Sequence, residues 1–416
     1  MILYYILVLS FPLMAHPYFT YQIGEFTVTQ CLGMLCLAYA LYYNTRRRYA
    51  VSFLSHWQVR LFLLFYVLAL LSVVSSPSSE PQSQLIRVYT AHLAFMFVVL
   101  IVLDSENRLR WSLLTCAAGI GLGSLYCLRE WQRGVVLYGA SFRPGWVTGD
   151  SNYFTASAIV GLQFGFMFLG KQHARWERVF AAGCITVSLL AITLGASRGG
   201  FIGLAVSILF QIWRSPHRVR NLVAVVLLAA LLFALLPQSP LERLLYPSSS
   251  DVSAANARLV AWGAAWKMIC AHPILGIGLG NFKPLMATYS RADESSIAHN
   301  TYLEIAAEMG IPSFLVFVAL LIASWMGLQR VRRGALSIGA PFIAETAHAL
   351  QAGMLGFWVA IAMVSAEFVK LLWFAIFLSA ALPQLLQGYF LEAKARHKTQ
   401  TTNAPLLAGQ EEVVRK

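Results

Sequence analysis

The sequence predicts an all-α, polytopic membrane protein of about twelve transmembrane helices, with one large loop that contains an amphipathic helix. Of its 416 residues, 58% are hydrophobic and 12% are charged, and the mean hydropathy is +0.64. Ordinary soluble domains carry about 25% charged residues. Apolar runs recur from Met1 to about Leu386, and no segment between them is long enough for a soluble domain. We therefore expect residues 1–416 to form a single integral membrane domain.

Twelve apolar segments qualify as membrane helices, because one crossing needs about 20 apolar residues. We place these helices at residues 1–15, 23–43, 60–75, 85–103, 111–129, 152–170, 179–195, 199–213, 221–236, 301–327, 345–365 and 367–388. The first segment lacks the charged n-region and the A-x-A site of a cleaved signal peptide, so we expect it to be a first helix.

The distribution of the basic residues predicts the topology. The formal net charge is +13, but the basic residues form short clusters between apolar runs. A nucleic-acid-binding protein would carry them on one continuous stripe, so no nucleic acid partner is expected. With a cytoplasmic N-terminus, alternate connections hold 20 of the 31 Lys and Arg residues, which satisfies the positive-inside rule. Both termini are then cytoplasmic, and we expect the polar tail, residues 390–416, to be disordered.

Residues 237–300 form the one long connection on the opposite, outer side. Within it, an apolar stripe has the i, i+3, i+7, i+10 spacing of an amphipathic helix, formed by Leu259, Trp262, Trp266 and Ile269. We expect this helix to lie along the membrane surface with its tryptophans at headgroup level. His272-Pro273 ends it, and three glycines form the next turn. No strand precedes these glycines, so a dinucleotide-binding loop is not indicated.

Eleven basic residues remain on the outer side, against the insertion bias. Eight of them are arginines, and the full set is Arg87, Arg129, Arg133, Arg143, Arg198, Arg243, Arg258, Lys267, Lys283, Arg291 and Lys370. Each could simply snorkel to the interface. As a group they favour an anionic ligand, because a guanidinium fork matches phosphate oxygens better than an ammonium does. A lipid-linked phosphate or pyrophosphate would explain the set.

Two of these arginines have distinctive settings. Arg198 lies in Thr193-Leu-Gly-Ala-Ser-Arg-Gly-Gly200, where glycines allow close approach and the next helix exposes backbone amides, a combination suited to phosphate. Arg258 opens the amphipathic helix, one residue before its apolar stripe. Interfacial snorkelling remains the alternative for both.

His299 is the candidate base. It precedes a membrane helix that begins Thr301-Tyr-Leu-Glu, and a neutral imidazole can accept a proton near pH 7. Tyr302 and Glu304 are near enough in sequence to orient it. A lone histidine at a helix start is often structural, and this alternative stays open.

No metal site is indicated. The six cysteines show no CxxC spacing, and the outer acidic residues, Asp150, Asp251, Asp293 and Glu294, show neither the regular spacing of a glycosidase pair nor a DxD-like pair. Asp150, Ser151 and Asn152 are typical of an N-terminal cap for the sixth helix. Arg143, earlier in that loop, could contact the same anion as the other arginines.

The sequence resembles the O-antigen ligase and polymerase superfamily. The segments that carry the resemblance are Gly149-Asp-Ser-Asn-Tyr-Phe154, Ser197-Arg-Gly-Gly200, Arg258 with Trp262 and Trp266, His272-Pro-Ile-Leu-Gly-Ile-Gly278, His299-Asn-Thr-Tyr-Leu303 and Glu308-Met-Gly310. Each segment is short, and their order and shared side make the combination specific.

The resemblance implies a GT-C-like membrane enzyme of the bacterial inner membrane, with its active site facing the periplasm. Such a ligase transfers a pre-assembled polysaccharide from undecaprenyl pyrophosphate to a sugar hydroxyl of lipid A-core, with inversion and without a metal or other cofactor. It also implies that Arg198 and Arg258 hold the pyrophosphate and that His299 is the general base. We further expect six residues to contact the substrates: Arg87, Arg143, Arg291, Asn300, Tyr302 and Trp262.

Several alternatives share these features. An O-antigen polymerase and a protein glycosyltransferase of the same superfamily carry the same motifs, and the compact 237–298 loop favours the ligase. A non-catalytic transporter of lipid-linked glycans would use the arginines for binding alone. Transporters more often place ionisable residues at the bilayer midplane and show repeated halves, and neither feature is evident.

Overall fold

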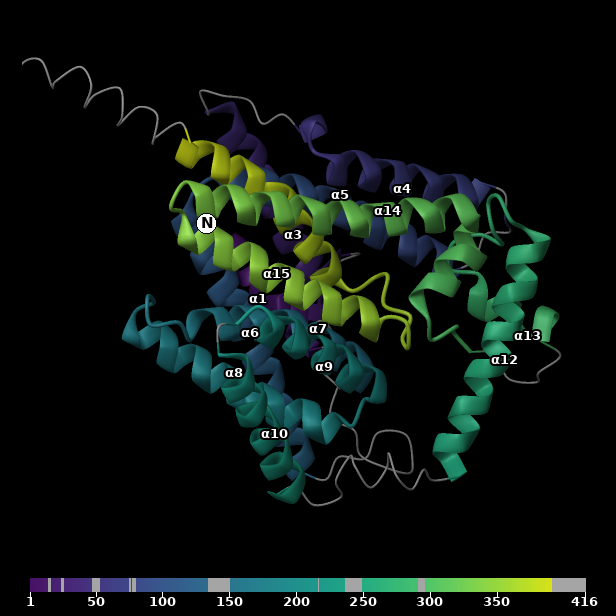
Figure 1. Ribbon diagram of the computed structural model, residues 1–416. Coiled ribbons are helices and arrows are strands. Elements are labelled where there is room, and N and C mark those ends of the chain that lie inside the picture. The colour runs from purple at the N-terminus through teal and green to yellow at the C-terminus, as the bar shows by residue number, and fades with distance from the viewer. Residues whose placement is uncertain are drawn as a thin grey trace, which may run out of the picture.

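The computed structural model shows a bundle made almost entirely of α-helices (Figure 1). It describes residues 1–13, 16–23, 26–46, 53–74, 76, 80–133, 150–215, 217–235, 249–290 and 296–390. The expected tail, from residue 391 onward, lies outside these ranges.

The first part of the chain forms six main helices and a small hairpin. Its elements are α1 (Ile2–Ser10), the 3-10 helix η1 (Phe11–Leu13), α2 (Pro17–Thr20), β1 (Gln22–Ile23), β2 (Phe26–Thr27), α3 (Val28–Thr45), η2 (Phe53–Ser55), α4 (Trp57–Val74), α5 (Glu80–Val102), α6 (Glu106–Gln132) and α7 (Ser151–Phe168). The two strands pair antiparallel, with Gln22 opposite Thr27.

The rest of the described chain is helical. Its elements are α8 (Arg175–Gly195), α9 (Arg198–Trp213), α10 (Arg218–Leu235), α12 (Ser249–Ala271), α13 (Phe282–Ser290), α14 (Thr301–Ser337), α15 (Pro341–Ala360) and a last helix, Lys370–Phe390. In Figure 1, α4, α5 and α14 run alongside one another, and α12 crosses one end of the bundle. Met1 and the end of the last helix lie at the opposite end, which we call the N-terminal end.

The helix predictions agree with the structure in position and differ at the boundaries. Each of the twelve predicted segments coincides with a helix. Six described helices are long and apolar enough to cross a membrane: Trp57–Val74, Glu80–Val102, Glu106–Gln132, Arg175–Gly195, Thr301–Ser337 and Lys370–Phe390. The segment predicted at 23–43 begins instead with the strand hairpin, and the segment predicted at 345–365 ends at Ala360. This all-α architecture fits a polytopic membrane protein.

The helix predicted along residues 259–269 is present as part of α12, and its apolar stripe is divided between exposed and buried positions. Ile269 is buried and Trp262 is half-buried, whereas Leu259 and Trp266 are 62% and 64% exposed. The buried face of α12 contains three small residues, Ala261, Ala264 and Ala265, together with Met268 and Ile269. Small side chains let α12 approach α13 and α14 closely, which a periodicity of large apolar residues cannot indicate.

A kink in α14 explains the three glycines that follow α12. Gly310 has a φ of 81° inside α14, and Pro312 has no backbone N–H, so the carbonyl of Glu308 lacks its usual intrahelical donor. The N–H of Gly278 donates to that carbonyl across 2.9 Å. Gly276, Gly278 and Gly280 all have positive φ, so the predicted turn is present.

The Glu308 side chain completes this junction. Its carboxylate accepts hydrogen bonds from the N–H groups of Gly280 and Phe282, at 2.8 and 2.9 Å. These donors belong to the start of α13, where backbone N–H groups otherwise lack partners. The junction fixes α12, α13 and the first part of α14 as one unit at the end of the bundle.

Candidate active site

Four charged or titratable residues from separate parts of the chain come together beside α12. Arg258 interacts electrostatically with Asp150 and Arg198, and His299 interacts with Arg258 and Asp150. Asp150 caps α7, Arg198 opens α9, Arg258 lies in α12, and His299 closely precedes α14. The fold therefore brings together the three predicted catalytic residues and adds an acidic one.

A network of caps positions Arg198. Ala196 adopts the left-handed conformation with a φ of 45° and ends α8. The Ser197 hydroxyl then accepts a hydrogen bond from the Gly200 N–H and donates one to the Asn152 side-chain oxygen across 2.7 Å. Because Asn152 lies in the first turn of α7, this network joins the start of α9 to the start of α7.

The two glycines after Arg198 make room for protein atoms. A Cβ on Gly200 would lie 2.2 Å from Cγ2 of Thr155, and one on Gly199 would lie 2.7 Å from Cβ of Met363. The Gly200 N–H is also already bonded to Ser197. These glycines therefore serve close helix packing, which the sequence motif alone could not distinguish from close approach of a ligand.

Arg258 is half-buried in α12. Burial lowers its pKa, the nearby Asp150 raises it, and the nearby Arg198 lowers it again. A guanidinium remains protonated across the physiological range even so. Two cations whose charges repel at a partly desolvated site would be stabilised by a bound anion.

His299 lies beside this pair in a strained conformation. Its φ is 50°, and it and Ala196 are the two non-glycine residues with positive φ in the described part of the chain. Its Nδ1 atom is buried and has no hydrogen-bond partner among the described residues. Burial lowers the pKa of His299, Arg258 lowers it further, and Asp150 opposes the effect. The imidazole is therefore neutral at pH 7, the form that accepts a proton.

The residues on either side of His299 hold it in place. The indole N–H of Trp262 donates to the Ala298 carbonyl across 2.9 Å. The Asn300 side chain caps α14 by accepting from the N–H groups of Tyr302 and Leu303, at 3.0 and 3.1 Å. The Tyr302 hydroxyl donates to the Trp358 carbonyl across 3.0 Å. Trp262, Asn300 and Tyr302, expected as substrate contacts, thus make structural hydrogen bonds next to the candidate base.

The start of α14 is also tied to the segment between α15 and the last helix. The Thr301 hydroxyl donates to the Val364 carbonyl and accepts from the Ala366 N–H, both at 2.8 Å. One turn further along α14, the buried Glu304 carboxylate accepts a hydrogen bond from the Ser365 hydroxyl. Glu304 therefore anchors the helix that follows His299.

Three other expected substrate contacts are not placed in this cluster. Arg87 is exposed on α5, where its Nε donates to the Ser83 carbonyl across 3.4 Å and its guanidinium lies 3.9 Å from the Glu80 carboxylate. Arg143 and Arg291 lie outside the described residues.

Asp150 is the member of the cluster whose role the sequence did not reveal. Its carboxylate accepts a hydrogen bond from the Asn152 N–H at 2.5 Å, as an N-terminal cap does. The capping pattern explained the residue fully, so nothing indicated a second role. Its position inside the Gly149–Phe154 motif was the available signal.

The cluster contains cations, a carboxylate and an imidazole. In the described part of the chain, no three His, Cys, Asp or Glu side chains gather in a way that could hold a metal ion. The chemistry available from these residues is anion binding by two guanidinium groups beside a neutral base.

Residues 183–318 match the family model described as O-antigen ligase. This match covers 136 of the 416 residues and supports a resemblance to the O-antigen ligase and polymerase superfamily. The matched range contains Arg198, Arg258 and His299, and it ends within α14. No curated protein matches the chain.

This match confirms the resemblance found in the sequence. It implies a glycosyltransferase-like or ligase activity on lipid-linked glycans in a membrane setting. Asp150 and the α7 cap lie outside the matched range, so their link to the arginine and histidine pair comes from the structure.

Proposed function

We propose that the protein is an O-antigen ligase that transfers a pre-assembled polysaccharide from undecaprenyl pyrophosphate to a sugar hydroxyl of lipid A-core. The observation that supports this is the meeting of Arg198, Arg258 and His299 at one end of a helix bundle in a chain that resembles this superfamily. In the proposal, the α12 end faces the periplasm and the N-terminal end faces the cytoplasm of a bacterial inner membrane.

The two arginines bind the leaving group. As the bond between the anomeric carbon and the pyrophosphate oxygen breaks, negative charge grows on the pyrophosphate. Fixed guanidinium groups stabilise that charge without reorganisation, so the proposed reaction needs no divalent metal. Because Arg198 is exposed and Arg258 is half-buried, the pair can reach a headgroup at the membrane surface.

His299 accepts the proton of the attacking hydroxyl. The acceptor oxygen then forms a bond to the anomeric carbon from the face opposite the pyrophosphate, which inverts the configuration. Undecaprenyl pyrophosphate leaves with the bonding electrons, and His299 later releases the proton to water. The neutral state of the buried imidazole suits it to this step.

A reconstituted transfer assay with the purified chain, both lipid substrates and a chelator tests the proposal. We expect His299→Asn to abolish transfer and keep donor binding, since asparagine tolerates the positive φ of this position. Full activity of this variant would rule out the base assignment, and loss of wild-type activity on chelation would rule out the metal-free mechanism.

The arginine assignment has its own test. Arg198→Lys keeps the charge and loses the bidentate fork, so we expect weaker donor binding and slower transfer. Arg87→Lys is the matched control because Arg87 bonds within its own helix, and it should leave both quantities unchanged. Equal behaviour of the two variants would show that Arg198 only snorkels.

A deletion strain separates the ligase from its polymerase relatives. Loss of a ligase leaves lipopolysaccharide without any O-antigen, whereas loss of a polymerase leaves a single repeat unit. If the deletion strain still adds a single repeat unit, the protein is a polymerase that extends the glycan at the same site, and the proposed ligase function is wrong. A protein that only transports lipid-linked glycan would give no product in the reconstituted assay.

A further inference from the structure

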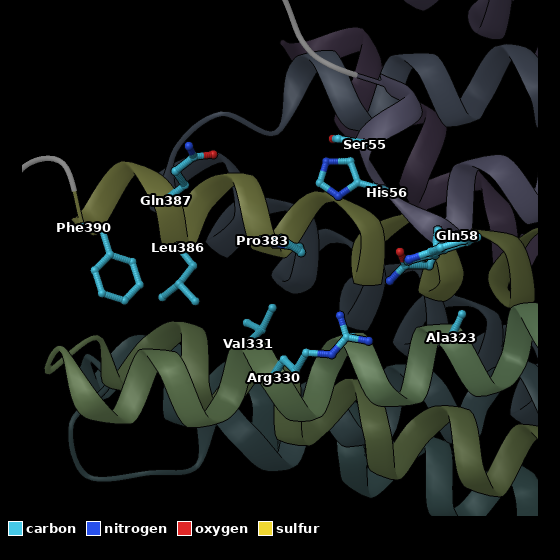
Figure 2. A pocket seen from close by; sticks show the side chains of 12 residues that line it. Ser55, His56, Gln58, Ala323, Arg330, Val331, Pro383, Leu386, Gln387 and Phe390 are labelled. Carbon is cyan, nitrogen blue, oxygen red and sulfur yellow. The ribbon is translucent and has the colours of Figure 1, made fainter.

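A second site lies toward the N-terminal end of the bundle. It is away from the cluster of Asp150, Arg198, Arg258 and His299, which we call the arginine and histidine cluster. It is a pocket of about 330 Å³ between the start of α4, the middle of α14 and the last helix (Figure 2). Polar side chains line one part of it, among them His56, Gln58 and Gln387. Leu386 and Phe390 provide apolar lining. The pocket is therefore amphiphilic.

Arg330 supplies the charge of this pocket. It extends from α14 into the space below the last helix, with its guanidinium directed toward the side where Gln58 lies (Figure 2). None of the described lining residues is acidic. Burial lowers the pKa of His56, so the imidazole adds no charge at pH 7. The pocket thus presents one cation and no anion from the described residues, which suits one anionic group.

An apolar face of α14 leads directly to Arg330. Ile322 and Met326 are 52% and 48% exposed, and they lie eight and four residues before Arg330 on the same helix face. Leu315 continues this face toward the start of the helix and is 57% exposed. In a membrane this face contacts hydrocarbon chains. Arg330 lies at the end of the face, which is where the headgroup of a lipid whose acyl chain lies along the face would be.

We propose that this pocket binds an anionic phospholipid, with Arg330 holding the headgroup phosphate and an acyl chain lying along Leu315, Ile322 and Met326. Gln387, which also lines the pocket, can donate hydrogen bonds to the polar headgroup. The proposal does not depend on the transfer reaction, because no residue of the pocket belongs to the arginine and histidine cluster.

Lipid titration of the purified full chain tests the proposal, with native mass spectrometry as the measurement. The probes are phosphatidylglycerol, phosphatidylcholine and inorganic phosphate. We expect phosphatidylglycerol to bind most tightly and Arg330→Gln to weaken this binding about tenfold, as loss of one charge-assisted contact should do. Arg330 is exposed, so the variant loses no buried contact and should fold. Arg330→Lys, which keeps the charge, should bind with an intermediate affinity.

Arg333→Gln is the matched control, because Arg333 is exposed on the same helix and does not line the pocket. It should leave phosphatidylglycerol binding unchanged. An equal loss in both glutamine variants would mean diffuse attraction to a charged surface and would overturn the proposal. Equal affinity for phosphatidylcholine would remove the role of the net anionic charge, and inorganic phosphate binding as tightly as the lipid would remove the role of the acyl chains.

Discussion

The indole N–H of Trp262 donates a hydrogen bond to the carbonyl oxygen of Ala298 across 2.9 Å. Trp262 lies one helical turn after Arg258 in α12, and Ala298 directly precedes His299. This hydrogen bond therefore ties the helix that carries Arg258, which we propose binds the pyrophosphate, to the segment that carries His299, the proposed base. It assigns the tryptophan a positioning role in addition to any contact with substrate.

Trp262→Phe should slow transfer and leave donor affinity nearly unchanged. Phenylalanine keeps an aromatic ring and loses the N–H donor, and a neutral hydrogen bond contributes about 1 kcal/mol, which corresponds to about a fivefold change in rate. Steady-state kinetics in the reconstituted assay measures the effect on kcat against KM. Trp266→Phe is the control, since Trp266 is mostly exposed on the same helix. A rise in KM with unchanged kcat would show that Trp262 binds substrate and does not position His299.

Ser197→Ala should weaken donor binding as well as stability. The hydroxyl caps α9 and bonds to Asn152, and loss of an N-cap costs about 1 kcal/mol. Because the same hydroxyl holds the start of α9, where Arg198 lies, the arginine should lose its fixed position. Thermal unfolding and donor-binding measurements test the two effects separately.

A second hydroxyl provides the control for this variant. Ser215 accepts a hydrogen bond from the His217 N–H across 3.2 Å between α9 and α10. Ser215→Ala removes a local hydrogen bond of similar kind, so it should affect stability without changing donor affinity. If the donor affinity is unchanged in Ser197→Ala, the hydrogen bonds of Ser197 to Asn152 and Gly200 do not position Arg198.

The candidate site could be predicted from the sequence at positions where a residue departs from the composition expected of a membrane protein. Arginines on the outer side oppose the insertion bias, and this anomaly, together with the neighbouring motifs, singled out Arg198 and Arg258. Asp150 breaks no rule, because a helix cap accounts for an aspartate at that position. Its electrostatic interaction with Arg258 and His299 depends on where the tertiary structure places the start of α7 relative to α12 and to the start of α14, which local sequence does not specify.

The helices could likewise be predicted from the sequence, whereas their packing could not. Apolar runs predicted the helices because burial in lipid needs length and hydropathy alone. The packing face of α12 was not predicted, because its alanines pack through close approach and large apolar residues dominate the periodicity. Residues 301–327 were predicted as one helix, so the kink at Gly310 and Pro312 was missed, and the partner of the freed carbonyl, Gly278, comes from another segment. Pairings of this kind require the tertiary structure.

Gly310→Ala should prevent accumulation of folded protein. At this position a Cβ would lie 2.1 Å from the Ile274 carbonyl oxygen, and φ is 81°, so backbone strain and overlap with backbone atoms act together. Gly339→Ala is the matched control: its φ is 70°, but nothing lies within 4 Å of the added Cβ. That variant should lose only about 1 kcal/mol from the left-handed conformation. Size-exclusion profiles and unfolding temperatures compare the two, and equal stability would argue against the close junction of α14 with the loop after α12.

The pH dependence of transfer tests the electrostatics around His299. Burial and Arg258 lower the pKa of His299 below its ordinary value of 6.5, and Asp150 acts in the opposite direction. The base works in its neutral form, so activity should be lost as the pH falls through the lowered pKa. Asp150→Asn removes the opposing charge, which should lower the pKa of His299 further and move the acid limb of the rate profile to lower pH.

This substitution isolates charge because asparagine caps a helix about as well as aspartate, so α7 should keep its start. Asp104→Asn is the control: Asp104 pairs with Arg108 at 2.9 Å, at the start of α6, and the pH profile should not move. Rates measured from pH 5 to 8 with saturating donor distinguish the outcomes. An acid limb that stays in place or moves to higher pH in Asp150→Asn would show that the carboxylate acts on α7 alone, and that His299 responds to burial and Arg258 without it.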